Sequence, residues 1–319
     1  MNLSILQELG IKVTPHALLR DHTTFKLGGA CKAMIECQNA QEMTAAIKAL
    51  RKIHASFLVM GFGSNILASD NGIDKIIVRY TTNTPLIEQK GNRLTVDAAT
   101  QFDDLARFAI NAGLDGMTTF SGIPGTVGGA IAGNAGAYGK QISDSLVSLT
   151  LLKPDNTVIS VPKSAISFSY RDSDIKHSND IILNAEFELP SGDTKTMLQK
   201  REETIRTREE KHGRWQDSPS AGSFFRNVEP TSKAGPRQSA GWFLDQAGAK
   251  DLRVGGAHSY KNHANIITRD DNAKAEDVLA LTLQMMAMVE KKFSIKLIRE
   301  VRLLGEFKNL PVSNPKGYS

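Results

Sequence analysis

The chain has 319 residues, a mass of 34.7 kDa, a formal net charge of +5 and a pI near 9.1. Hydrophobic residues make up 40% and charged residues 23%, which excludes a disordered or fibrous chain and is typical of a water-soluble globular protein. The length exceeds what one hydrophobic core ordinarily supports, so we expect two or three small domains.

The basic residues do not gather into a nucleic-acid-binding stripe. They are interleaved with 34 acidic residues, and no basic run has aromatic residues spaced through it. A net positive charge instead suits a small anionic ligand. We therefore expect no nucleic-acid partner.

The N-terminal segment, residues 1–8, lacks the basic start and the unbroken apolar run of a signal peptide. Residues 121–139 carry no formal charge, but they include Pro124, Asn134 and seven of the 26 glycines, a composition unsuited to a membrane-spanning helix. We predict a buried loop there, no membrane association and a cytoplasmic location. Cys31 and Cys37 have no His or Cys cluster with zinc spacing nearby, so we expect reduced thiols and no metal site.

Helix and strand patterns alternate in the first third of the chain. Apolar residues at 43, 46, 47 and 50 share one stripe of a helix predicted over 39–54. Apolar or alternating runs predict strands at 56–60, 74–80 and 93–98, and a helix follows at 102–112.

After the glycine-rich stretch the patterns change to β. Strands are predicted at 146–153, 156–161 and 180–188, followed by a charged helix over 194–211 whose Glu and Arg residues we interpret as a solvated face. A loop rich in Gly, Ser and Pro spans 213–241, and the last clear helix is predicted at 276–293. We place the main domain boundary near residue 210 and assign the fold to the α+β class.

A first glycine-rich turn, Gly61-Phe62-Gly63-Ser64-Asn65, directly follows a predicted strand. Such a turn is either an ordinary tight turn or an anion-binding nest of backbone N–H groups. It lacks the third glycine of the Rossmann fingerprint and the Gly-Lys-Ser/Thr of a Walker loop.

A second glycine-rich segment runs from Ser121 to Gly139. It is either a packing segment between domains or a backbone path that passes close to a flat or polyanionic ligand. Two such loops about 60 residues apart favour a dinucleotide with a long pyrophosphate bridge.

Together with five further segments, these loops resemble the p-cresol methylhydroxylase-type flavoprotein superfamily, and more narrowly the UDP-N-acetylenolpyruvoylglucosamine reductase family. The segments are collinear and cover about residues 20–305. They are 24–29 (TFKLGG), 61–65 (GFGSN), 121–130 with 134–139, 169–173 (SYRDS), 220–227 (SAGSFFRN), 254–257 (VGGA) with 263–265 (HAN), and 299–302 (REVR).

The resemblance implies a two-part FAD-binding unit of the p-cresol methylhydroxylase type, followed by a smaller α/β substrate-binding domain. The expected parts are 1–82, to which 301–319 return, 83–210, and 211–300. It also implies a monomeric enzyme of peptidoglycan synthesis. NADPH reduces non-covalently bound FAD and leaves, and a UDP-linked enolpyruvyl sugar then takes the hydride.

The resemblance assigns roles to six residues outside the glycine-rich loops. Arg171 binds the substrate carboxylate and stabilises the enolate, Ser223 donates a proton, and Glu300 is the third catalytic residue. Tyr170, Lys211 and Asn227 are the implied substrate-binding residues. Without the resemblance, Arg171 and Glu300 would be interpreted as ordinary ion-pair members and Ser223 as a turn or cap serine.

The implied FAD-binding residues all belong to the two glycine-rich loops. They are Gly61, Phe62, Gly63, Ser64 and Asn65 in the first, and Ser121, Gly122, Ile123, Pro124, Gly125, Thr126, Gly128, Gly129, Asn134, Gly136 and Ala137 in the second.

Two alternatives have different requirements. An oxidase of the same fold with covalent flavin needs a linking His or Cys near the flavin, and no histidine occurs in residues 55–176. A non-catalytic flavin- or nucleotide-binding protein would not need Arg171, Ser223 and Glu300. The chain departs from the family pattern at 212–220 and 229–239, so the substrate contacts made there stay open.

Overall fold

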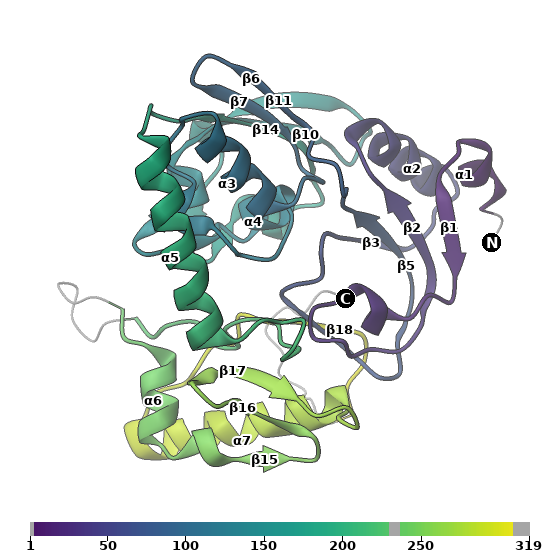
Figure 1. Cartoon of the computed structure of the whole chain (residues 1–319). Coiled ribbons are helices and arrows are strands. Elements are labelled where there is room, and N and C mark those ends of the chain that lie inside the picture. The colour runs from purple at the N-terminus through teal and green to yellow at the C-terminus, as the bar shows by residue number, and fades with distance from the viewer. Residues whose placement is uncertain (1–2, 230–236, 309–319) are drawn as a thin grey trace. The chain divides into compact units, whose positions relative to one another are not determined.

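The structure, a computed structural model, describes residues 3–229 and 237–308, which fold as two compact units (Figure 1). Unit 1 contains 3–16, 32–62 and 75–207. Unit 2 contains 17–31, 63–74 and the described residues from 208 onward. Two short early segments therefore belong to the same unit as the C-terminal third of the chain.

A four-stranded sheet in unit 1 has the order β1 (Lys12–Pro15), β2 (Cys31–Cys37), β5 (Ile73–Tyr80), β3 (Phe57–Met60), with β3 parallel to β5. Helix α1 (Ser4–Glu8) precedes it, and α2 (Ala40–Lys52) follows β2. Asn39 caps α2 by accepting a hydrogen bond from Glu42 N at 2.9 Å. The stripe of Met43, Ala46, Ile47 and Leu50 is buried, as its spacing predicts.

A five-stranded antiparallel sheet forms the rest of the unit 1 core. Its order is β11 (Val158–Pro162), β10 (Leu146–Leu152), β14 (Ile181–Glu188), β7 (Arg93–Asp97), β6 (Ile87–Lys90). Helix α4 (Val127–Ala132) packs on β7 and β14, and α3 (Phe102–Asn111) lies beside α4 (Figure 1). Helix α5 (Thr194–His212) starts in unit 1, where Arg201 pairs with Asp103 of α3 at 2.6 Å.

A buried polar contact joins the two sheets of unit 1. The Tyr80 hydroxyl, at the end of β5, donates to Asp97 Oδ1 at 2.7 Å, and Asp97 Oδ2 accepts from the backbone N of Ala40 at 2.8 Å. Burial raises the pKa of the Asp97 carboxyl. Asp97 thus ties both sheets to the first turn of α2.

The glycine-rich segment of unit 1 leads into two small hairpins. These are β8 (Gly136–Ala137) with β9 (Lys140–Gln141), and β12 (Phe168–Ser169) with β13 (Asp172–Ser173). Single turns of 3-10 helix connect the other elements, at Leu19–His22, Thr118–Phe120, Ile142–Asp144, Lys163–Ala165, Asp174–His177 and Ala249–Asp251.

Unit 2 contains an antiparallel sheet of β15 (Arg253–Val254), β16 (Ala257–Tyr260) and β17 (His263–Arg269), packed against α6 (Ala240–Gln246) and α7 (Ala275–Phe293) (Figure 1). A second pairing is parallel and joins β4 (Ile66–Ala68) to β18 (Arg302–Leu304). Asp70 accepts from Ala275 N at 3.1 Å, which anchors the start of α7 to the segment after β4.

Every helix and strand predicted above is present, with ends within two residues of those expected. The prediction of a buried loop over 121–139 is wrong in two respects. Residues 127–132 are helical because Thr126 caps them, accepting from Gly129 N at 3.2 Å, and Tyr138 is 62% exposed.

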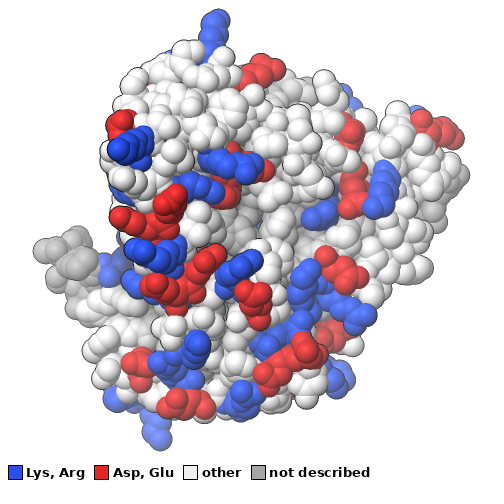
Figure 2. Space-filling model, in the orientation of Figure 1, with Lys and Arg blue, Asp and Glu red and all other residues white. Residues whose placement is uncertain are grey.

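Among the described residues, no helix combines the length and the apolar character needed to cross a bilayer. On the face drawn in Figure 2, Lys and Arg side chains are interspersed with Asp and Glu side chains.

Candidate functional site

The predicted site residues divide between the two units. Unit 1 holds Gly61, Phe62, the whole segment from Ser121 to Ala137, Tyr170 and Arg171. Unit 2 holds Gly63, Ser64, Asn65, Lys211, Ser223, Asn227 and Glu300. Each group is described within its own unit.

The two glycine-rich loops meet at Gly61 and Thr126 in unit 1. A methyl group built on Gly61 lies 2.5 Å from Thr126 Oγ1, closer than real Cβ contacts allow. Glycine permits this approach without displacing Thr126. The structure therefore brings together the start of the first loop and the cap of the helix in the second loop.

Asn134 is a buried residue that follows this helix, and its φ is +42°. Its Nδ2 donates to Gln141 Oε1 at 2.6 Å and to the Ser169 carbonyl at 2.8 Å. Its Oδ1 is buried and has no hydrogen-bond partner among the described residues. A buried acceptor of this kind fits a ligand that brings its own N–H or O–H group.

Arg171 is the second residue of the two-residue loop between β12 and β13. Its φ of +57° is left-handed, a conformation that costs a non-glycine residue about 1 to 2 kcal/mol. A methyl group built on Gly136 lies 3.2 Å from Arg171 Nη1, so the guanidinium lies against the glycine-rich segment. The guanidinium carbon also lies 5.6 Å from the centre of the Tyr170 ring. Strain at a charged residue beside a glycine-rich loop is typical of functional sites.

Ser223 and Glu300 lie on adjacent extended segments of unit 2. Ser223 forms an antiparallel bridge with Ile266 of β17, and the next residue, Phe224, accepts at its carbonyl from Glu300 N at 2.9 Å. Both residues are half-buried. Asn265 holds the serine segment, because its Oδ1 accepts from Phe225 N and its Nδ2 donates to Phe225 O, each at 2.9 Å.

Asn65 extends this arrangement to the first glycine-rich loop. Its Nδ2 donates to the Glu300 carbonyl at 3.2 Å, and its own carbonyl accepts from Arg302 N at 3.0 Å. Gly63, two residues earlier, has a φ of +75° and packs directly on the His22 carbonyl. The loop is therefore fixed to the Glu300 segment within unit 2.

Lys211 and Asn227 lie near two half-buried histidine rings and a helix start. Partial burial is the main cause that lowers the pKa of both His212 and His263, and nearby positive charge, including that of the exposed Lys211 at the end of α5, lowers them further. The pKa of His212 falls to about 4. The two rings meet edge to face with centroids 5.2 Å apart. Asn227 Oδ1 accepts from Ala240 N at 3.2 Å, at the first residue of α6.

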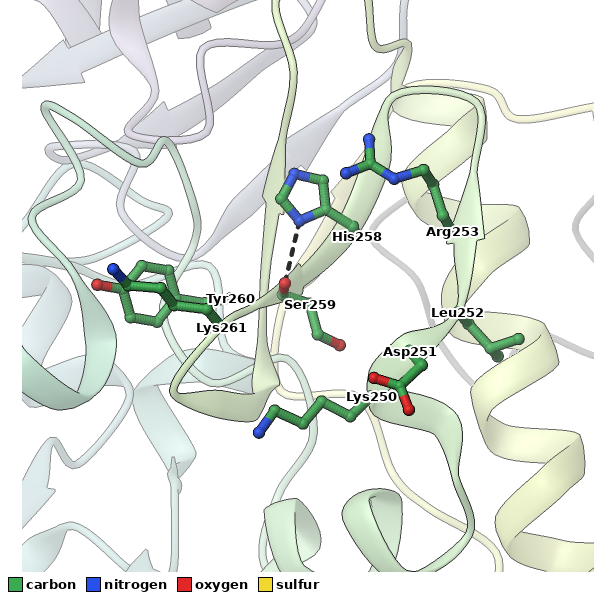
Figure 3. A pocket seen from close by; sticks show the side chains of 8 residues that line it. All are labelled: Lys250, Asp251, Leu252, Arg253, His258, Ser259, Tyr260 and Lys261. Carbon is green, nitrogen blue, oxygen red and sulfur yellow. Dashed lines mark hydrogen bonds between the residues drawn. The ribbon is translucent and has the colours of Figure 1, made fainter.

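A basic surface pocket of about 390 Å³ lies elsewhere on unit 2 (Figure 3). Its lining includes Lys250, Arg253, His258 and Lys261, and none of the predicted site residues. Arg253 and His258 both contact Asp270, and His258 Nδ1 lies 3.0 Å from the Ser259 carbonyl. The charge of Arg253 is therefore compensated by Asp270.

Sequence reasoning gave no role to Asn265 or to Lys176, which contacts Arg171. Asn265 lies in a segment that carried the family resemblance, so a signal for it was present. Lys176 follows Arg171 by five residues, and its contact depends on a loop conformation that no sequence pattern indicated.

Comparison with known proteins supports the same reading of the chain. Residues 31–162 match the model of an FAD binding domain, and residues 214–304 match the model of the UDP-N-acetylenolpyruvoylglucosamine reductase C-terminal domain. The chain is similar to UDP-N-acetylenolpyruvoylglucosamine reductases of Trichormus variabilis, with 34% identity over 302 residues (93% of this chain and 87% of the relative), and of Carboxydothermus hydrogenoformans, with 36% identity over 291 residues (90% and 92%).

A solved structure gives the same result for the fold. The crystal structure of the UDP-N-acetylenolpyruvylglucosamine reductase (MurB) of Thermus caldophilus aligns with a TM-score of 0.75 and 28% identity, covering 92% of this chain and 99% of that one. The predicted α+β class and the predicted family resemblance are confirmed. The chain belongs to the UDP-N-acetylenolpyruvoylglucosamine reductase family.

Proposed function

We propose that this protein reduces UDP-N-acetylglucosamine enolpyruvate to UDP-N-acetylmuramate in peptidoglycan precursor synthesis, using bound FAD and electrons from NADPH. The observation that carries the proposal is the presence in one chain of the FAD-binding domain and the family's C-terminal domain. Relatives whose alignments cover 93% of this chain carry the name of this activity.

The residues of unit 1 fit a bound FAD. Gly61 comes so close to Thr126 that a side chain there would fill the space between the loops, and Asn134 offers a buried acceptor without a partner among the described residues. We propose that these loops hold the cofactor through the residues that the family resemblance implied. The chemistry that FAD supplies when bound is two-electron transfer, from NADPH and then to the methylene carbon of the enolpyruvyl group.

Arg171 is proposed to act on the charge of the substrate. A guanidinium presents paired N–H donors to a carboxylate and stabilises the negative charge that develops when a hydride adds to the conjugated double bond. Two features support this role. The backbone of Arg171 is strained, and its guanidinium lies beside Gly136; an ordinary surface ion-pair residue requires neither.

Ser223 is proposed as the proton donor to the carbon next to the carboxylate. A serine hydroxyl is a weak acid, so it suits a strongly basic enolate carbon. The backbone that follows it is held on one side by Asn265 and on the other by the Glu300 segment, and this supports a positioned hydroxyl. Glu300 is proposed to act beside Ser223, with Tyr170, Lys211 and Asn227 as substrate contacts.

The division of the chain into 1–82 with 301–319, 83–210 and 211–300 is likewise a proposal. The parallel pairing of β4 with β18 supports the return of the C-terminal segment to the early part of the chain, and residues 309–319 lie outside the described residues. We further propose a cytoplasmic monomer without a nucleic-acid or membrane partner, since all reactants are small, water-soluble molecules. Light scattering of the purified protein tests the monomer.

Product analysis tests the reaction. The protein is incubated with NADPH and the enolpyruvyl substrate, and the sugar nucleotide is examined by mass spectrometry. The proposal predicts a product that has gained two hydrogen atoms, in equal molar amount to the NADPH oxidised. NADPH oxidation without that product would reject the substrate.

A further inference from the structure

The loop that carries Arg171 is held by a lysine five residues later. Lys176 Nζ donates to the Arg171 carbonyl at 3.0 Å and lies 3.5 Å from Asp172 Oδ1. The Lys176 side chain is only 12% exposed, so it is packed largely against protein, where polar contacts stabilise a charged group. Asp172 is held in turn by His177 Nε2, at 2.8 Å from Oδ1.

The same loop is anchored to the glycine-rich segment from its other side. Asn134 Nδ2 donates to the Ser169 carbonyl at 2.8 Å, and Ser173 Oγ donates to the Ala132 carbonyl at 2.8 Å. These bonds hold both strands of the hairpin in place. Only the backbone conformation of the two loop residues is not determined by them. Arg171 is one of them, and its left-handed backbone is disfavoured without external support.

We propose that Lys176 is the positioning residue of Arg171. By holding the Arg171 carbonyl, its ammonium group keeps that residue left-handed and so keeps the guanidinium against Gly136. This inference rests on the proposed function, in which Arg171 acts on the substrate rather than in the reduction of FAD by NADPH. Lys176 itself needs no contact with substrate or cofactor.

The test uses the FAD-loaded protein and follows the two half-reactions separately by stopped flow. Lys176→Met removes the hydrogen bond and keeps the length of the side chain. We expect NADPH to reduce the flavin at a rate within about threefold of the parent, while reoxidation by saturating enolpyruvyl substrate slows on the order of 10- to 100-fold. Lys176→Gln, which still offers an N–H donor, recovers most of this loss.

Lys163→Met and an Arg171→Met background serve as controls for the Lys176→Met variant. Lys163→Met changes a lysine of the same unit whose side chain makes no hydrogen bond or ion pair among the described residues, and it leaves both half-reactions unchanged. In an Arg171→Met background the Lys176→Met change has no further effect on reoxidation, because it acts only through Arg171. If Lys176→Met does not fold, Lys176→Ala replaces it, and the same selective slowing of reoxidation is expected.

The outcomes separate this inference from the function on which it rests. Unchanged reoxidation in Lys176→Met, equal slowing of both half-reactions, or a full Lys176 effect in the Arg171→Met background each overturns the positioning role. Normal reoxidation in Arg171→Met alone instead removes the proposed role of Arg171, and the inference falls with it.

Discussion

The side-chain amide of Asn65 donates a hydrogen bond to the backbone carbonyl of Glu300 at 3.2 Å, across 235 residues of sequence. Asn65 closes the first glycine-rich loop, which the family resemblance assigns to FAD. Within unit 2, however, its amide supports the segment that pairs with Phe224 and Phe225, the residues directly after Ser223. One residue thus links a proposed cofactor loop to a proposed catalytic segment.

Replacing Asn65 by Leu is expected to lower the free energy of unfolding by about 1 to 2 kcal/mol, because the Glu300 carbonyl loses its side-chain donor. Denaturant titration measures this. FAD affinity measured in parallel separates the two roles of Asn65. A variant with full stability and weakened FAD binding would show that the Glu300 contact contributes nothing.

Gly61→Ala is expected to weaken FAD binding by tenfold or more and to lower stability by about 1 to 3 kcal/mol, because the new methyl group would lie 2.5 Å from Thr126 Oγ1. The dissociation constant is measured by titrating FAD into deflavinated protein. Gly133→Ala is the matched control, since a methyl group there meets nothing closer than the Gly129 carbonyl at 3.5 Å. Equal effects of the two changes would contradict the close approach of the loops.

The sequence predicted the regular elements well where a periodic pattern was long enough. The apolar stripe of α2 and the apolar run of β14 are examples, and both are buried. It missed α4, whose six residues are too few for a helical period to emerge among glycines. It also missed the membership of residues 17–31 and 63–74 in unit 2, because long-range pairing leaves no local pattern.

The candidate site was predictable only through resemblance. Arg171, Ser223 and Glu300 have no special local signature, and each has an ordinary structural reading. The left-handed backbone of Arg171 was hidden, because turn chemistry assigns that conformation to Gly or Asn and not to Arg. Lys176 was hidden because its contact with the Arg171 carbonyl depends on that loop conformation.

His212 makes the stability of unit 2 depend on pH. Its pKa of about 4 in the folded protein lies below the ordinary value of about 6.5, mainly because the ring is buried. Between these values the unfolded chain binds more protons, so the contribution is complete above pH 6.5 and is lost as the pH falls toward 4.

Thermal unfolding at pH 7 and pH 5 checks this dependence. His212→Gln is expected to remove on the order of 2 kcal/mol of the difference in stability between the two pH values. His54→Gln, which changes an exposed histidine of unit 1, should leave the difference as it is. The same pH dependence in His212→Gln and the parent protein would exclude His212 as its source.

Ser223→Ala is expected to leave the reduction of FAD by NADPH within about twofold and to slow reoxidation by the enolpyruvyl substrate 100- to 10,000-fold, roughly the contribution of a positioned proton donor. Stopped-flow absorbance measures both steps. Ser160→Ala, at an exposed position of β11, is the control. A similar slowing of both steps would remove Ser223 from the role of proton donor.

The most direct test of the proposed function is an anaerobic titration followed by visible absorbance. The protein is loaded with FAD, reduced with one equivalent of NADPH, and then given UDP-N-acetylglucosamine enolpyruvate. We predict that the flavin bleaches with NADPH and that the substrate restores the oxidised spectrum. Bleaching without recovery would contradict the assigned substrate, and a protein that takes up no FAD would contradict the account as a whole.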